Sequence, residues 1–166
     1  MLVALEGVDC VGKTTLFGEL RPLLKAKFVP SLPLPSELWP VMPWVELRQV
    51  SLWEHLYDPD QLYVCDRSVF TSAPVYDALM ERPLLFDPSK WASEVRVLYL
   101  QLGDVGLARR FAERGDAHIT AKQMQRLHQL YEEHCLSRFE YYRIDAARPD
   151  LVSAAVRVIR GWTRDA

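Results

Sequence analysis

The chain contains 166 residues, of which 49% are apolar and 25% are charged, and its formal net charge is −2. These values predict a soluble protein with one domain over residues 1–166 and a substantial hydrophobic core. They do not favour a protein whose main task is to grip a nucleic-acid backbone. We expect no signal peptide and no membrane partner, because the apolar runs are too short to cross a bilayer. The three cysteines, Cys10, Cys65 and Cys135, are scattered and indicate reduced thiols in the cytoplasm.

Short apolar runs alternate along the chain with segments of helical periodicity. Strands are predicted at Leu2–Leu5, Phe28–Val29, Leu62–Cys65, Val95–Leu102 and Tyr142–Asp145. Helices are predicted over 13–26, 68–80, 104 to at least 110, 120–138 and 151–162. Pro22 is expected to end or kink the first helix, and the dense prolines of residues 30–60 predict short helices and loops. This alternation predicts an α/β fold, with a parallel sheet covered by helices on both faces.

The sequence from Gly7 to Thr14 matches the P-loop pattern G-x-x-x-x-G-K-[ST] at every fixed position. It follows a predicted strand and opens a predicted helix, which is the context that the motif requires. The two glycines let backbone N–H groups turn inward around the phosphates of ATP. Lys13 is expected to reach the β- and γ-phosphates, Thr14 to ligate Mg²⁺, and Thr15 to bond the α-phosphate. The predicted ATP-binding residues of the loop are Gly7, Val8, Asp9, Cys10, Val11, Gly12, Lys13, Thr14 and Thr15. The motif predicts a P-loop NTPase three-layer sandwich with five strands in the order 2-3-1-4-5.

Asp66 and Arg67 follow the third predicted strand. Ligands of such sheets bind at the carboxyl ends of the strands, so Asp66 is a candidate to hold Mg²⁺ and Arg67 to bind a phosphate. The alternative is that Asp66 caps the next helix and pairs with Arg67. The P-loop favours the functional interpretation.

Three arginines, Arg109, Arg110 and Arg114, lie beyond the fourth predicted strand. They suit a lid segment over about residues 104–120 that closes on the phosphates and stabilises charge in the transition state. The alternative is a solvated helix face in which Arg110 pairs with Glu113. The sequence leaves both interpretations open.

Together these features resemble the thymidylate kinases, within the wider group of nucleoside and nucleotide kinases. The resemblance rests on four segments in the family's order: Leu5–Thr15 with its internal Asp9, Asp66-Arg67 followed by Phe70 and Thr71, Leu107–Gly115, and Ile144–Ala146 followed by Pro149. It implies that Asp9 meets the 3′-hydroxyl of the acceptor sugar, Arg67 orients the acceptor phosphate and Ala146 lies against adenine. Cys10 stands where some members carry an arginine, and in members without that arginine the lid supplies it.

The chain departs from the family after the second predicted strand. Residues 29–39 contain no Arg-Glu-Pro-Gly segment, which in the family helps to grip the acceptor. Pro35–Trp39 instead resembles the Glu-containing segment of deoxynucleoside kinases. Glu37 is then the candidate base for a nucleoside hydroxyl, and its alternative is an ordinary glutamate in the first turn of a helix. Phe70 is a candidate to stack on the acceptor base, although most aromatic residues at such spacing belong to the core.

The sequence thus predicts an ATP- and Mg²⁺-dependent kinase, first for a thymidylate-type nucleoside monophosphate. The alternatives are a deoxynucleoside kinase, or a kinase for the hydroxymethyl group of a modified pyrimidine, free or in DNA, with DNA not favoured. A P-loop switch with little turnover is the alternative from another class. The resemblance also makes a homodimer possible: the apolar residues Val69, Phe70, Ala73 and Tyr76 of helix 68–80 are a candidate surface for it, and the alternative is that they belong to the core.

Overall fold

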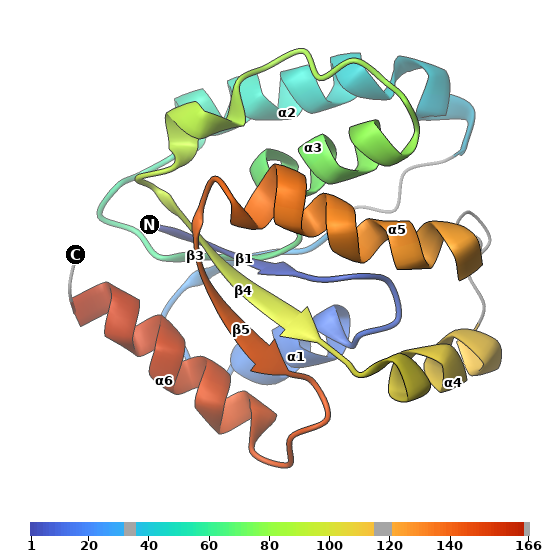
Figure 1. The fold of residues 1–166 in the computed structure, drawn as a ribbon. Coiled ribbons are helices and arrows are strands. Elements are labelled where there is room, and N and C mark those ends of the chain that lie inside the picture. Colours follow the sequence, from blue (N-terminus) through green and yellow to red (C-terminus); the bar gives the residue numbers. More distant parts are fainter. Residues whose placement is uncertain (32–35, 115–120, 165–166) are drawn as a thin grey trace.

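The structure is a computed structural model that describes residues 1–31, 36–114 and 121–164. Its centre is a five-stranded sheet in the order β2-β3-β1-β4-β5 (Figure 1), and every neighbouring pair is parallel. The strands are β1 (Leu2–Glu6), β2 (Lys27–Val29), β3 (Tyr63–Asp66), β4 (Val95–Gln101) and β5 (Glu140–Asp145). The predicted fold class and strand order are confirmed.

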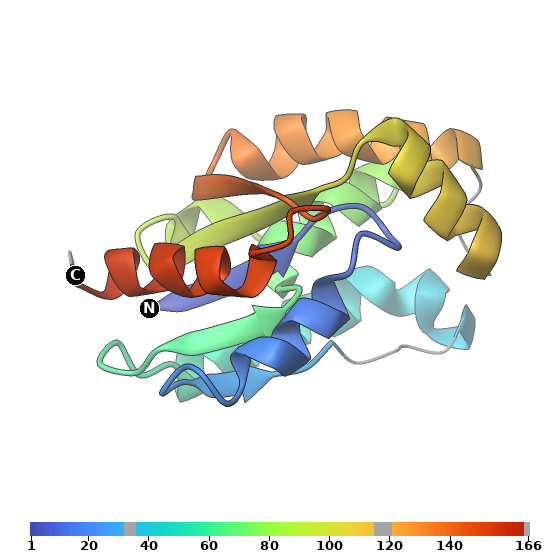
Figure 2. The same ribbon diagram turned by 90° about the horizontal axis from the view of Figure 1, so that it is seen from below.

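Helices cover both faces of the sheet, as predicted. They are α1 (Lys13–Leu20), α2 (Met42–Leu56), α3 (Val69–Leu79), α4 (Asp104–Arg114), α5 (Ala121–Tyr131) and α6 (Leu151–Arg164). Figure 1 shows α2, α3 and α5 on one side of the sheet, and Figure 2 shows α1 and α6 on the other. The helix α4 lies beyond the carboxyl end of β4, on the same side of the molecule as the P-loop (Figure 1).

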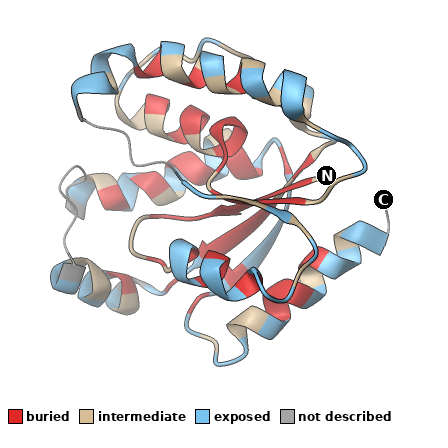
Figure 3. Ribbon diagram, turned by 180° about the vertical axis from the view of Figure 1, so that it is seen from behind, coloured by how far each residue is buried: buried red, intermediate tan, exposed pale blue. Residues whose placement is uncertain are grey.

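Burial follows this layered arrangement (Figure 3). All five residues of β1 are buried, because β1 lies at the centre of the sheet with helices above and below it. Since a central parallel strand is enclosed on both faces, its sequence is a continuous apolar run rather than an alternating one. The exception in that run is Glu6, a fully buried carboxylate at the end of the strand.

Two helices differ from the prediction at proline positions. The first helix, α1, ends at Leu20, shortly before Pro22, so this proline ends the helix rather than kinking it. The expectation that residues 30–60 hold only short helices is wrong, because α2 is a helix of 15 residues. Pro43 lies in the first turn of α2, where the missing N–H has no partner within the helix and costs nothing.

The third helix is more deeply buried than predicted. It begins after Ser68, whose side chain accepts a hydrogen bond from the N–H of Phe70 as the cap. Val69, Phe70 and Ala73 are all buried against the rest of the molecule. The surface predicted for a homodimer is therefore part of the core. The predicted cap Thr120 lies outside the described residues.

A short π-helical turn, η3 (Glu132–Leu136), continues from α5, and a 3₁₀ turn, η1 (Ser36–Val41), precedes α2. A second 3₁₀ turn, η2 (Pro88–Trp91), leads to β4. Within the described ranges, none of the helices has the length and apolarity needed to cross a bilayer.

Candidate active site

The P-loop wraps tightly at the carboxyl end of β1. Gly7 and Gly12 have φ values of 138° and 104°, in the region that favours glycine. A Cβ atom on Gly7 would collide with the carbonyl oxygen of Leu100 in β4. Gly12 directly precedes α1, so the positive end of that helix faces the space enclosed by the loop. The backbone therefore takes the tight turn that the motif predicts, and its role as a phosphate cradle stays a prediction.

Lys13 is buried under this loop. Its Nζ atom donates hydrogen bonds to the carbonyl oxygens of Gly7 (2.9 Å) and Val8 (2.8 Å). Burial, and then the nearby charge of Arg67, lower the pKa of Lys13 to about 7. A bound triphosphate would favour the ammonium form again, because an adjacent anion stabilises positive charge. The lysine is thus positioned to respond to the phosphates of a nucleotide.

The predicted metal ligands Thr14 and Asp66 are in direct contact. Thr14 Oγ1 at the start of α1 donates a hydrogen bond of 2.7 Å to Asp66 Oδ2 at the end of β3. A hydroxyl and a carboxylate oxygen are the hard ligands that Mg²⁺ prefers, and two protein ligands suffice when phosphates and water complete its shell. The residues therefore fit Mg²⁺. The alternative role of Asp66 as a cap is not supported, because Ser68 caps α3.

Arg67 is held by residues from three separate elements. Its guanidinium group forms an ion pair with Asp9 of the P-loop and donates a hydrogen bond of 3.0 Å to Tyr131 Oη at the end of α5. It also lies over the ring of Tyr76 in α3, whose hydroxyl donates to Asp9 (2.8 Å). Arg67 and Asp9 are 58 positions apart in the sequence, and the structure joins them in one network of hydrogen bonds.

Glu6, at the end of β1, holds the residues around Arg67 in place. Its carboxylate accepts hydrogen bonds from the N–H of Ser68 (3.1 Å) and from the hydroxyls of Thr71 (2.6 Å), Ser72 (2.7 Å) and Tyr131 (2.9 Å). Four donors compensate for burying the charge, as a buried carboxylate requires. The sequence analysis missed Glu6, Tyr76 and Tyr131 as site residues. Of these three, only Glu6 could have been found from the sequence, because it is a carboxylate at the end of an otherwise apolar strand.

Arg109 and Arg110, two of the three arginines predicted for the lid, take different positions. Arg110 Nη1 donates a hydrogen bond of 2.9 Å to the carbonyl oxygen of Val11, so this side chain reaches the P-loop. Arg109 is 73% exposed and pairs with Glu113 (3.8 Å). For Arg114 the structure describes the backbone alone, at the end of α4. The expected pairing of Arg110 with Glu113 is thus replaced by one between Arg109 and Glu113.

A cavity of about 300 Å³ opens beside Arg110 and the P-loop. Its walls include Cys10, Gly12 and Thr15 of the P-loop region and Ala146, which follows β5. The N–H of Ala146 is bonded to the carbonyl oxygen of Gln101 (2.7 Å), which fixes the loop after β5 against β4. The structure therefore brings Ala146 to the same cavity as the P-loop, as the resemblance predicted.

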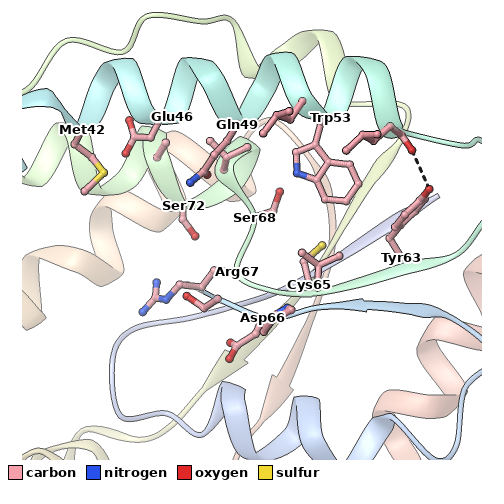
Figure 4. A pocket seen from close by; sticks show the side chains of 17 residues that line it. Met42, Glu46, Gln49, Trp53, Tyr63, Cys65, Asp66, Arg67, Ser68 and Ser72 are labelled. Atoms are coloured by element: carbon pink, nitrogen blue, oxygen red, sulfur yellow. Dashed lines mark hydrogen bonds between the residues drawn. The ribbon is translucent and has the colours of Figure 1, made fainter. Parts of the chain in front are cut away.

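A second cavity, of about 480 Å³, opens on the other side of Asp66 and Arg67 (Figure 4). Its lining residues come from the end of β2 and the following residues, from α2, from β3 and from α3. Much of the wall is apolar, including Met42, Leu52 and Trp53. Asp66 and Arg67 thus lie between the P-loop and a cavity large enough for a small acceptor.

Two residues predicted for this acceptor site are not in the cavity wall. Phe70 is completely buried and stacks on Trp91, with ring centroids 4.2 Å apart, so its ring has no free face for a base. The substrate-binding role of Phe70 is therefore corrected to a core role. Glu37 lies exposed on η1, and its role as a base stays a prediction. Trp53 is the aromatic residue of α2 that lines the cavity (Figure 4).

The sheet order, the P-loop turn and the contact between Thr14 and Asp66 define a domain with the fold of the P-loop kinases. No family model matches the chain. The chain is 29% identical over 141 residues to the SPbeta prophage-derived uncharacterized protein YorR of Bacillus subtilis (strain 168), covering 80% of each protein.

Solved structures share the fold over nearly the full chain. A structure of YorR from Bacillus subtilis in complex with phosphorylated GDP superposes with a TM-score of 0.70 at 20% identity, covering 100% of this chain and 99% of that one. Deoxyadenosine kinase from M. mycoides with bound dATP gives a TM-score of 0.66 at 16% identity, covering 96% and 99%. A gluconokinase from Sinorhizobium meliloti 1021 gives 0.56 at 15% identity, covering 98% and 93%. The similarity extends across kinases of different acceptors and fixes the fold.

Proposed function

We propose that this protein transfers the γ-phosphoryl group of ATP, with Mg²⁺, to a neutral hydroxyl group of a nucleoside, most simply the 5′-hydroxyl of a deoxynucleoside. The observation that carries the proposal is the position of Asp66 and Arg67 between the P-loop and the 480 Å³ cavity. A phosphoryl donor on one side and an acceptor on the other would meet at these two residues. The fold shared with kinases supports the donor half of the reaction.

The charges of the cavity support a neutral acceptor over a monophosphate. Among the lining residues that the structure describes, Arg67 is the basic one, and this arginine is already paired with Asp9. Two acidic residues, Glu46 and Asp66, line the same cavity. A monophosphate carries up to two negative charges at neutral pH and needs cations to hold it. Residues 32–35 are Leu, Pro, Leu and Pro and bring no cation either.

Each site residue then has a role in the transfer. Lys13, the N–H groups of the P-loop and Arg110 stabilise the negative charge on the transferring group. Thr14 and Asp66 would hold Mg²⁺, which would supply positive charge to the phosphates of the nucleotide. Arg67 orients the acceptor beside the γ-phosphate. A hydroxyl acceptor must lose its proton, and Glu37 remains the candidate base for that step.

A thymidylate-type monophosphate is the second candidate acceptor. The contact between Asp9 and Arg67 favours it, because the thymidylate kinase resemblance implies that this pair holds the sugar and phosphate of the acceptor. In that reaction the acceptor is already an anion and Glu37 is not needed. The two candidates therefore differ in their dependence on Glu37.

An acceptor panel tests the proposal. ATP consumption with Mg²⁺ would be measured with each deoxynucleoside, each deoxynucleoside monophosphate and single-stranded DNA that carries hydroxymethylated pyrimidines. We expect turnover with a nucleoside, and a loss of about 100-fold in kcat for Glu37→Gln, as for removal of a general base. Turnover confined to a monophosphate and unaffected by Glu37→Gln would overturn the nucleoside assignment. Slow ATP hydrolysis at a rate that no acceptor changes would instead indicate a P-loop switch.

A further inference from the structure

Two buried carboxyl groups and a partly exposed arginine join the two helices that contribute to the walls of the acceptor cavity. Glu46 of α2 and Asp77 of α3 are 8% and 1% exposed. Arg82, just beyond α3, places Nη2 at 2.7 Å from Asp77 Oδ1 and at 3.9 Å from Glu46 Oε1. Glu46 also lines the cavity, on the side of α2 that carries Met42 and Gln49 (Figure 4). The group therefore lies directly behind the cavity wall.

The charges of this group do not balance without a proton. Two buried carboxyl groups face one guanidinium group, and a second uncompensated negative charge in a buried position is strongly unfavourable. Glu46 Oε2 and Asp77 Oδ2 are buried, and while both carboxyl groups are ionised no donor in the described part of the chain offers either oxygen a hydrogen bond. A proton on Glu46 resolves both problems, because it removes one charge and lets the two carboxyl groups hydrogen-bond to each other.

The electrostatics of the pair agree with a shared proton. Burial, and then the hydrogen bond and charge of Asp77, raise the pKa of Glu46 to about 8, although Arg82 acts in the opposite direction. Burial also raises the pKa of Asp77. The charged groups acting on Glu46 are thus Asp77 of α3 and Arg82 beyond it, and those acting on Asp77 are Glu46 and Arg82.

We propose that Glu46 and Asp77 share one proton, that this proton fixes α2 against α3, and that the acceptor cavity keeps its binding geometry only while the pair holds it. Glu46 and Asp77 are positioning residues, since they act through the walls of the cavity. The proposal rests on the assignment of the 480 Å³ cavity to the acceptor. The P-loop and Arg110 belong to other elements, so ATP binding is independent of the pair.

The first test follows acceptor binding as a function of pH. From pH 7 to pH 9 we expect the KM for the acceptor to rise about tenfold in the unmodified protein, because loss of the proton leaves two negative charges on one arginine. The KM for ATP can rise over the same range because the pKa of Lys13 is about 7, but that rise should be the same in the unmodified protein and in Glu46→Gln. Glu46→Gln should give an acceptor KM that hardly varies with pH, since the amide donates to Asp77 without titrating. Glu54→Gln, a change at an exposed position of the same helix, is the matched control and should keep the unmodified profile.

The second test needs no acceptor and separates this proposal from the proposed function. A folded-state pKa above the ordinary value means that the folded protein holds the proton more tightly, so stability is present at low pH and is lost as pH rises toward about 8. The melting temperature should therefore fall between pH 5 and pH 8, and Glu46→Gln and Asp77→Asn should each reduce that fall. If both variants showed the same fall in melting temperature with pH as the unmodified protein, the proposal of a shared proton would be wrong, even if the kinase assignment is right. A reduced fall with no acceptor turnover at any pH would uphold the pair and reject the proposed function.

Discussion

The two cavities on either side of Asp66 and Arg67 are built in different ways. The cavity beside the P-loop is lined largely by one continuous segment, whose backbone conformation is fixed by Gly7 and Gly12 and whose polar groups are held by short hydrogen bonds. The acceptor cavity is assembled from four separate segments and has a largely apolar wall. Phosphate recognition needs one local conformation, whereas the shape that selects an acceptor depends on how whole helices pack. The solved relatives with this fold include kinases of quite different acceptors, in agreement with this division.

The largest effect is expected at the donor side of this comparison. Replacement of Lys13 with alanine should lower kcat by about 1,000-fold, because it removes a preorganised positive charge from the transferring phosphate. The melting temperature should fall little, since the buried lysine gains only two hydrogen bonds to carbonyl oxygens against the cost of burying its charge. Steady-state kinetics with a thermal melt would test both expectations. Retention of more than a tenth of the activity would remove Lys13 from the mechanism.

The lid offers a matched pair of arginines for a smaller effect. Arg110→Ala should lower kcat by about 10- to 100-fold, because Arg110 reaches the P-loop and can neutralise charge in the transition state. Arg109→Ala should change kcat less than about twofold, since Arg109 points into solvent and pairs weakly with Glu113. Equal losses in the two variants, measured under the same conditions, would show that the lid acts as a general positive surface.

The smallest effect is expected where the two cavities meet. Tyr131→Phe removes the hydroxyl that bridges Glu6 and Arg67. We expect a loss of about 1 kcal/mol in the free energy of unfolding and a few-fold rise in the KM for the acceptor, with the KM for ATP unchanged. Chemical denaturation and kinetics would measure both quantities. Tyr142→Phe, on an exposed part of β5, is the control, and a matching shift in that variant would mean that Tyr131 has no special role.

The sequence predicted the conformation of the P-loop well because the information for it is local. A strand, a glycine-rich turn and a helix are adjacent in the chain, so the motif specifies its own conformation. Asp66 was also accessible to sequence reasoning, because the carboxyl ends of parallel strands meet at one edge of a sheet. The sheet order followed from the same motif.

The acceptor side resisted prediction because it depends on tertiary packing. Phe70 follows the Asp-Arg segment in sequence, yet the helical turn after Ser68 directs its ring to Trp91 and the core. Tyr131 is 64 positions from Arg67, and no local pattern marks it. Glu46 lies on α2, in a region where the prolines predicted only short helices and loops. Its pairing with Asp77 therefore could not be predicted from the sequence. Pairings of this kind depend on which helices pack against each other, and hydrophobic periodicity does not reveal the packing partners of a helix.

The position of β1 in the sheet has a consequence for how the protein is made. β1 is bonded to β3 on one side and to β4 on the other, so both of its neighbours lie far along the chain. During synthesis on the ribosome, β1 and the loop after it emerge before the strands that they pair with, so β1 has no partners until the chain has grown past Asp66 and then past Gln101. Such non-local parallel pairings form late, because the entropy cost of closing a long loop comes before the strand contacts that compensate for it. The P-loop segment is therefore made before β3 and β4 but reaches its final conformation only after both strands are complete.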